Sequence, residues 1–102
     1  SPNFITQKNI TASTRLLQKN SDNIQNCIIC IPFADPGYDW IFSFNIVGLI
    51  TCYGGINSHM AIRAGEMGIP AVIGCGEAKF KIWSNAKTLR IDCNNKEVLI
   101  IS

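Results

Sequence analysis

The sequence lacks several features by which protein classes are recognised. Nine Lys and Arg residues exceed seven Asp and Glu residues by two and are spread without a dense cluster, so a nucleic-acid-binding surface is not indicated. The most apolar stretch, residues 40–53, is interrupted by Ser43 and Asn45 and is shorter than the roughly 18 residues of a membrane span. A signal peptide with a basic start and an apolar middle is also missing. We therefore expect no nucleic-acid or membrane partner.

Cysteine pairs with the spacing of a zinc site or a disulfide framework are also missing. The cysteines are odd in number and scattered, at positions 27, 30, 52, 75 and 93. Cys27 and Cys30 lie in an apolar run that resembles a strand, where residues three apart point to opposite faces, and no second pair completes a zinc site. We therefore expect reduced, buried thiols without a metal or redox role, and a cytoplasmic location.

The length and composition fit one small domain. The chain has 102 residues, of which 47% are hydrophobic and 16% charged, and this apolar content favours folding around a single core. The chain opens with Ser-Pro-Asn rather than methionine, which suggests that residues 1–102 were excised from a longer, multidomain protein.

The pattern along the chain predicts an α/β fold. The stretches that resemble strands are residues 3–6, 9–14, 27–31, 46–51, 71–73, 89–93 and 98–101. Helices are expected at 36–44, where Asp35 can cap and Pro36 occupies the first helical position, and at 59–67. Residues 18–26 are expected to form a loop. Strand and helix alternate from 27 to 73, which favours a parallel sheet, and the turn at 94–96 predicts a C-terminal antiparallel hairpin.

The most informative segment leads to the single histidine. Gly54 and Gly55 allow a tight turn, Asn57 belongs to the same loop, and Ser58 is a good N-cap that places His59 in the first helical turn. Free amides at a helix start bind phosphate oxygens, and the positive helix end favours a neutral, nucleophilic imidazole. On spacing alone, however, a structural histidine that caps or forms hydrogen bonds is the more frequent explanation.

Two stripes are expected along this helix. His59, Arg63 and Glu66 share a polar stripe that should face solvent. Arg63 could bind phosphate oxygens on His59 or form an ordinary surface pair with Glu66, and the sequence does not decide between them. The small residues that should pack on the sheet are Ala61, Ala64, Gly65 and Gly68.

Residues 54–62, GGINSHMAI, and 68–74, GIPAVIG, resemble the signature of the mobile phosphohistidine domain of phosphoenolpyruvate-utilising enzymes. That family includes phosphoenolpyruvate synthase and pyruvate phosphate dikinase. The resemblance implies a three-layer β/β/α swivelling domain with a central parallel sheet and a small antiparallel sheet. It also implies that His59 carries the phosphoryl group, with Gly54, Gly55 and Ser58 shaping its loop.

The same resemblance implies partner domains. In the family, a nucleotide-binding ATP-grasp domain phosphorylates the histidine, which then swings to a barrel domain where pyruvate, or another acceptor at another site, takes the group. This chain has no glycine-rich nucleotide loop with its lysine and no carboxylate pair suited to magnesium. Mg and ATP are therefore expected on a partner domain, with no metal or cofactor bound here and no turnover by the isolated chain.

The chain departs from the family pattern in three places. The family usually has arginine at the position of Gly65 and an apolar residue at that of Arg63, so a phosphate-contacting arginine is displaced by two positions or absent. Plant-type dikinases carry a regulatory threonine where Asn57 stands, so that switch is not expected here. The alternative is a non-catalytic interaction domain that retains the fold, favoured by Gly65 and opposed by the intact Ser58 and His59.

Overall fold

The computed structural model describes residues 1–18 and 23–102. The strands are β1 (Asn3–Ile5), β2 (Asn9–Leu16), β3 (Ile28–Ile31), β4 (Gly48–Thr51), β5 (Ala71–Ile73), β6 (Thr88–Asp92) and β7 (Glu97–Ile100). The helices are the 3-10 helix η1 (Pro36–Phe44) and the α-helices α1 (His59–Met67) and α2 (Glu77–Ser84). The predicted α/β class is therefore confirmed.

The strands form one mixed sheet in the order β1-β5-β4-β3-β2-β6-β7. The pairs β2–β3, β3–β4 and β4–β5 are parallel. The pairs β1–β5, β2–β6 and β6–β7 are antiparallel. The predicted parallel strands and C-terminal hairpin are both present. Strand β3 lies in the middle and is buried along its whole length, as its unbroken apolar sequence predicts.

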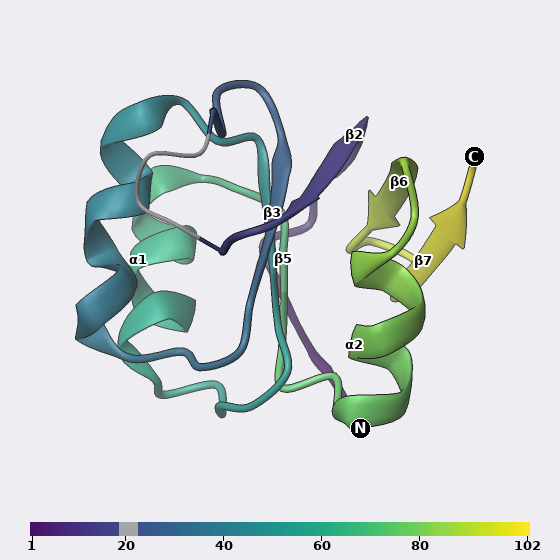
Figure 1. The fold of residues 1–102 in the computed structure, drawn as a ribbon. Coiled ribbons are helices and arrows are strands. Elements are labelled where there is room, and N and C mark those ends of the chain that lie inside the picture. The colour runs from purple at the N-terminus through teal and green to yellow at the C-terminus, as the bar shows by residue number, and fades with distance from the viewer. Residues whose placement is uncertain (19–22) are drawn as a thin grey trace.

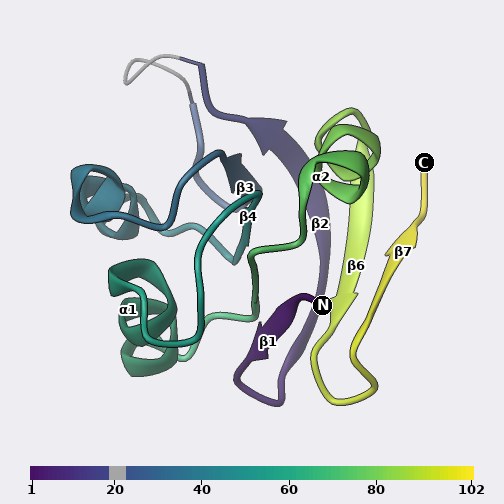
Figure 2. The ribbon, with the colours of Figure 1, turned by 90° about the horizontal axis from the view of Figure 1, so that it is seen from below.

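Strand β2 joins two parts of the sheet. Residues 9–13 pair with β6, and residues 14–16 pair with β3. Figure 2 shows β2 between the central strands and the hairpin of β6 and β7. The alternating exposure of β2 is typical of a strand with one face in contact with the core.

Helices cover the two sides of the central strands unequally. In Figure 1, η1 and α1 lie on one side of β3 and β5, while α2, β6 and β7 lie on the other. Successive residues of β3 point to opposite sides, so Ile29 and Ile31 belong to the core under η1 and α1, and Ile28 and Cys30 to the core under the hairpin. The central strands are therefore packed on both faces.

Several predictions for individual elements can be compared with this fold. Both predicted helices have the expected bounds, although 36–44 is a 3-10 helix, and Asp35 caps it by accepting from the Gly37 N–H at 3.0 Å. Gly65 is exposed, whereas Ala61 and Ala64 are buried against the core as predicted. Of the predicted loop 18–26, residues 19–22 lie outside the described residues. Helix α2 was not predicted.

Candidate functional site

Two close-fitting glycines shape the loop before His59. Gly54 has a φ of +128°, and a Cβ atom there would lie 2.5 Å from Ala34 Cβ. Gly74 has a φ of +73°, and its Cβ would lie 2.2 Å from the carbonyl oxygen of Gly54. Only glycine fits such contacts in such conformations. The predicted role of Gly54 in shaping the loop agrees with this geometry, whereas a Cβ at Gly55 would meet nothing within 4 Å.

A buried threonine ties this loop to the sheet. Thr51, at the end of β4, donates its hydroxyl to the Tyr53 carbonyl oxygen at 2.9 Å and accepts the Gly74 N–H at 3.0 Å. The loops after β4 and β5 are thus joined at the edge of the sheet where α1 begins. This bonding fixes the position of the start of α1 relative to the strands.

Ser58 does not cap α1 in the way that its sequence position predicted. Its backbone is extended, as at an N-cap, but its side chain makes no capping hydrogen bond. The hydroxyl instead donates to the Gly55 carbonyl oxygen at 2.7 Å, so it stabilises the turn and leaves the helix amides free of side-chain capping. Asn57 is exposed in the same turn. One amide of the first turn, that of Met60, donates to the Ala34 carbonyl oxygen at 3.3 Å.

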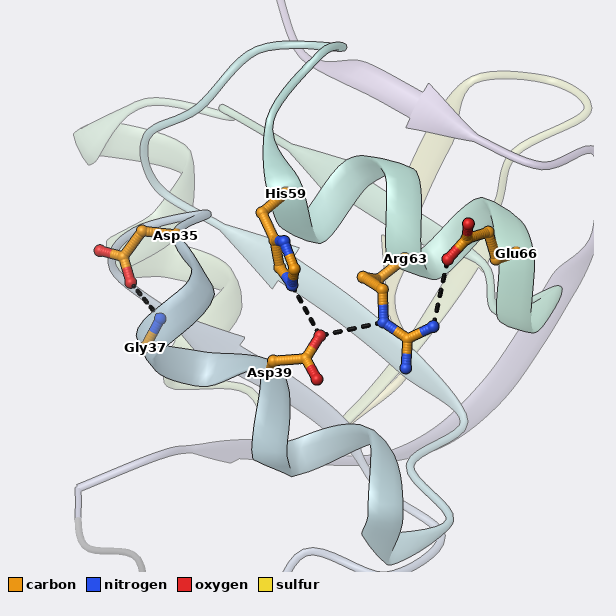
Figure 3. Close-up of polar contacts among 6 residues, drawn as sticks. All are labelled: Asp35, Gly37, Asp39, His59, Arg63 and Glu66. Atoms are coloured by element: carbon orange, nitrogen blue, oxygen red, sulfur yellow. Dashed lines mark hydrogen bonds and ion pairs between the residues drawn. The ribbon is translucent and has the colours of Figure 1, made fainter.

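His59 faces η1 and forms a hydrogen bond with Asp39. The distance from His59 Nε2 to Asp39 Oδ1 is 2.7 Å, and the two side chains are 36% and 41% exposed. Figure 3 shows the imidazole and the carboxylate pointing toward one another from α1 and η1. An ionised carboxylate only accepts hydrogen bonds, so Nε2 carries the proton in this arrangement.

Arg63 shares the same carboxylate oxygen. Its Nε donates to Asp39 Oδ1 at 2.9 Å, its Nη1 donates to Glu66 Oε1 at 3.1 Å, and its guanidinium carbon lies 5.4 Å from the centre of the Phe42 ring. The predicted surface pair with Glu66 is therefore present. The predicted polar stripe of α1 faces η1 as well as solvent, so it is only partly exposed.

Hydrogen bonds from His59, and then from Arg63, hold the pKa of Asp39 below its usual range. Both donors bind the carboxylate in its charged form, and this favours ionisation. Arg63 has a raised pKa because Asp39 and Glu66 accept its hydrogen bonds. At neutral pH the site therefore contains a carboxylate bridged between an imidazole N–H and a guanidinium.

The cysteines take no part in this site. All five are free and buried, and Cys27 and Cys30 lie in the two opposite cores, as the strand spacing predicted. Burial raises the pKa of the Cys30 thiol to about 12 and that of Cys75 to about 11. Neither thiol is ionised at neutral pH, so neither is a competing nucleophile.

One further hollow lies away from this site. A cavity of about 420 Å³ is lined by residues of the N-terminus, α2 and β7. Figure 1 shows that α2 and β7 lie on the side of the sheet away from α1. Within residues 1–18 and 23–102, no group of three or more His, Cys, Asp or Glu side chains is arranged to hold a metal ion. No helix in the same ranges has the length and apolarity needed to cross a membrane.

Sequence reasoning identified His59, Arg63 and Glu66 but missed Asp39. The acidic residue lies 20 positions before the histidine, on a helix predicted only from the cap at Asp35 and from Pro36 at its first position. The available signal was that the expected helix 36–44 carries one acidic residue in its first turn. The sequence did not show that this turn packs beside α1.

Comparisons with known proteins agree with the motif around His59. Residues 24–96 match the family described as "PEP-utilising enzyme, mobile domain". The chain is 38% identical over 64 residues to rifampicin phosphotransferase of Bacillus cereus, covering 63% of this chain and 7% of that protein. It is 34% identical over 80 residues to phosphoenolpyruvate synthase of Aquifex aeolicus, covering 78% of this chain and 9% of that protein.

A third relative, phosphoenolpyruvate synthase of Synechocystis, is 46% identical over 45 residues, which is 44% of this chain and 5% of that enzyme. The chain therefore spans less than a tenth of the length of these phosphotransferase relatives. The family match covers most of the chain and includes the glycine turn and His59. The chain belongs to the family of mobile domains of PEP-utilising enzymes.

Proposed function

We propose that this chain is a phosphoryl carrier in which His59 accepts a phosphoryl group at one active site and gives it up at another. The observation that carries the proposal is the placement of a half-exposed imidazole in the first turn of α1, directly after the Gly54 turn. The positive end of α1 favours a phosphate dianion there. The family match supports the same role.

The chemistry needs only one nucleophilic atom from this chain. The lone pair of an imidazole nitrogen attacks phosphorus, the bond from phosphorus to the leaving oxygen breaks, and its electrons remain on the donor. The acceptor later attacks the same phosphorus and the histidine leaves as imidazole. Positioning and charge stabilisation supply most of the catalysis in such displacements, and Gly54, Gly55, Asn57 and Ser58 form the loop that positions His59. Arg63 is the candidate cation for the phosphoryl oxygens.

We further propose that residues 1–102 act as one swivelling domain of a larger cytoplasmic enzyme. The position of η1 and α1 on one side of the central strands, with the β6–β7 hairpin and α2 on the other (Figure 2), is compatible with the three-layer β/β/α arrangement. A nucleotide-binding, ATP-grasp-like domain would supply the group from Mg-ATP, and a further domain would transfer it to pyruvate or another acceptor. The two kinds of relative are a phosphoenolpyruvate synthase and a rifampicin phosphotransferase, so the final acceptor is a separate question.

The second candidate is a non-catalytic interaction domain. Its support is Gly65, which stands where the family usually has arginine and is exposed. A Cβ at Gly65 would make only an ordinary contact of 3.7 Å with Ile5 Cγ2. Space for a larger side chain is therefore present, and packing does not explain the loss of arginine.

The test is to incubate the full-length product of the gene with Mg-ATP, and separately with phosphoenolpyruvate, and to locate phosphate by peptide mass spectrometry at alkaline pH. Alkaline handling preserves the acid-labile phosphorus–nitrogen bond. We expect phosphate on the His59 peptide, its loss in His59→Ala, and its retention in Lys81→Ala, a control on the exposed surface of α2. A folded protein that binds nucleotide and takes phosphate from neither donor would favour the interaction domain.

A further inference from the structure

One carboxylate oxygen of Asp39 occupies the space in front of the outer nitrogen of His59. Oδ1 is 2.7 Å from His59 Nε2 and 2.9 Å from Arg63 Nε, so it bridges the two side chains (Figure 3). Nε2 is the ring nitrogen farthest from the backbone and therefore the atom most accessible to an incoming donor. In this arrangement its hydrogen-bonding direction is already occupied.

A phosphoryl group attached to Nε2 would bring its oxygens into the region that Oδ1 now fills. The carboxylate and the phosphoryl dianion would also repel one another at such a distance. The two groups therefore exclude each other sterically and electrostatically. Each is an anion with oxygens that can accept the hydrogen bond from Arg63 Nε.

We propose that Asp39 is a displaceable substitute for the phosphoryl group, which occupies Nε2 and Arg63 at rest and leaves when His59 is phosphorylated. The inference rests on the proposed carrier function. Asp39 thereby controls access to the nucleophile, and Arg63 becomes available to phosphate when Asp39 leaves.

Arg63 is prepared for this exchange because two contacts remain after Asp39 has left. Glu66 accepts its Nη1 hydrogen bond at 3.1 Å, and the Phe42 ring lies beneath the guanidinium. The guanidinium thus stays one helical turn from His59 while the anion bound to its Nε changes. The three side chains of the bridge are between 34% and 41% exposed, so water can replace the displaced carboxylate at small cost.

The protons balance through tautomer exchange. At rest Nε2 carries the ring proton and Nδ1 has the lone pair. When Asp39 moves away, Nε2 releases its proton to water and Nδ1 takes one up, so the ring remains neutral. The lone pair of Nε2 then attacks phosphorus, the bond to the leaving oxygen of the donor breaks, and its electrons remain on that oxygen.

A different role for Asp39 makes the opposite prediction. If the carboxylate instead fixed the tautomer and Nδ1 were the nucleophile, Asp39 would stabilise the growing positive charge on the ring. Removing it would then slow phosphorylation. The direction of the rate change therefore separates a displaceable anion from a positioning residue.

The experiment treats the chain with potassium phosphoramidate, a small phosphoryl donor that needs no partner domain, and follows the rate and the site of labelling by NMR. We expect Asp39→Ala to label about five- to tenfold faster at His59 Nε2, as expected for loss of a partly exposed charged hydrogen bond. Asp39→Asn should fall between this variant and the unaltered chain. Glu97→Gln removes a remote, exposed carboxylate of β7 and should leave the rate unchanged.

Equal or slower labelling of Asp39→Ala, or labelling of the unaltered chain at Nδ1, would overturn the inference. Circular dichroism verifies that each variant is folded, and the isosteric Asp39→Asn gives a second comparison. Phosphoramidate reacts without an enzymatic donor. Failure of Mg-ATP and phosphoenolpyruvate to label His59 would thus refute the carrier proposal and remain distinguishable from failure of the Asp39 exchange.

Discussion

Both sides of the central strands carry a buried apolar cluster, but the two sides differ at their outer surfaces. On the side of η1 and α1, a hydrogen bond connects His59 to Asp39, and two ion pairs connect Arg63 to Asp39 and to Glu66. On the other side, α2 contributes no fully buried residue, and its aromatic side chains Phe80 and Trp83 are partly buried against the second core. One side therefore holds the groups of the proposed site, and the other side supports the sheet beneath them.

The site is formed where two short helices, η1 and α1, pack side by side. His59 comes from α1 and Asp39 from η1, and both helices pack on the same core. The far side reaches the loop before His59 through the strands and through the hydrogen bond that the Tyr53 hydroxyl donates to Glu77 of α2. Changes that remove core volume from either side should therefore reduce stability similarly, although only one side carries the proposed chemistry.

The largest effect should come from truncating neighbouring core residues of β3. Ile28 and Ile29 are both fully buried, one beneath the hairpin and the other beneath the helices. We expect Ile28→Ala and Ile29→Ala each to lower the free energy of unfolding by about 2–5 kcal/mol in urea titrations, because each leaves a cavity. Ile82→Ala on α2, where the side chain is 57% exposed, should change it by less than about 0.5 kcal/mol. A clearly smaller loss of unfolding free energy in one of the two variants would show that the two cores do not stabilise the fold equally.

A slightly smaller loss of unfolding free energy is expected from a substitution in the loop that leads to His59. Gly54→Ala should cost about 2–4 kcal/mol, because the new Cβ clashes with Ala34 and the left-handed φ is strained. Gly55→Ala is the matched control, since its Cβ meets nothing within 4 Å, and should stay within about 0.5 kcal/mol. Thermal unfolding of the pair measures this difference. Equal stability of the two variants would show that the tight turn does not constrain the site.

The smallest effect on the free energy of unfolding is expected from its pH dependence. One aspartate on each side of the sheet contributes to it. The pKa of Asp39 is lowered by hydrogen bonds from His59 and Arg63, and that of Asp92 by hydrogen bonds from Asn95. A lowered pKa in the fold means that each contribution is complete above about pH 4 and is lost as the pH falls through the lowered value.

We therefore expect the free energy of unfolding to decline as the pH is lowered from neutral to about 3. The decline should be smaller in Asp39→Asn and in Asp92→Asn, because neither variant retains that titration. Urea titrations along the pH series measure it. An unchanged slope in Asp39→Asn would mean that the bridge to His59 and Arg63 contributes nothing to the folded state.

Much of the fold was predictable because local signals and tertiary packing agree in it. Helix α1 begins and ends where Ser58 and Gly68 predict, and the apolar run of β3 lies in the middle of the sheet. Helix α2 was missed because its apolar residues are only partly buried against the second core and its N-cap residue, Gly76, has no side chain that could cap the helix. Here tertiary contacts outweigh a weak local pattern.

Only the part of the site that lies within one segment of the sequence was predictable. The resemblance and the glycine turn identified His59, and helical spacing placed Arg63 beside Glu66. The bridge through Asp39 depends on how η1 packs against α1, and no pattern within either segment encodes that contact. The hydroxyl of Ser58 was assigned to a cap because residue type alone does not show that the Gly55 carbonyl is a nearer partner.

The pairing of the N-terminal strands has a consequence for how the chain folds. Strand β1 pairs with β5, where Asn3 lies opposite Ile73, and β2 begins opposite Asp92 of β6. During synthesis, β1 therefore cannot pair until β5 has been made, and the first half of β2 cannot pair until β6 has been made. Such separations along the chain slow folding, because large loops must close before the contacts form. Strand β6 completes the pairing of β2, so this sheet can be fully assembled only after most of residues 1–102 have been translated.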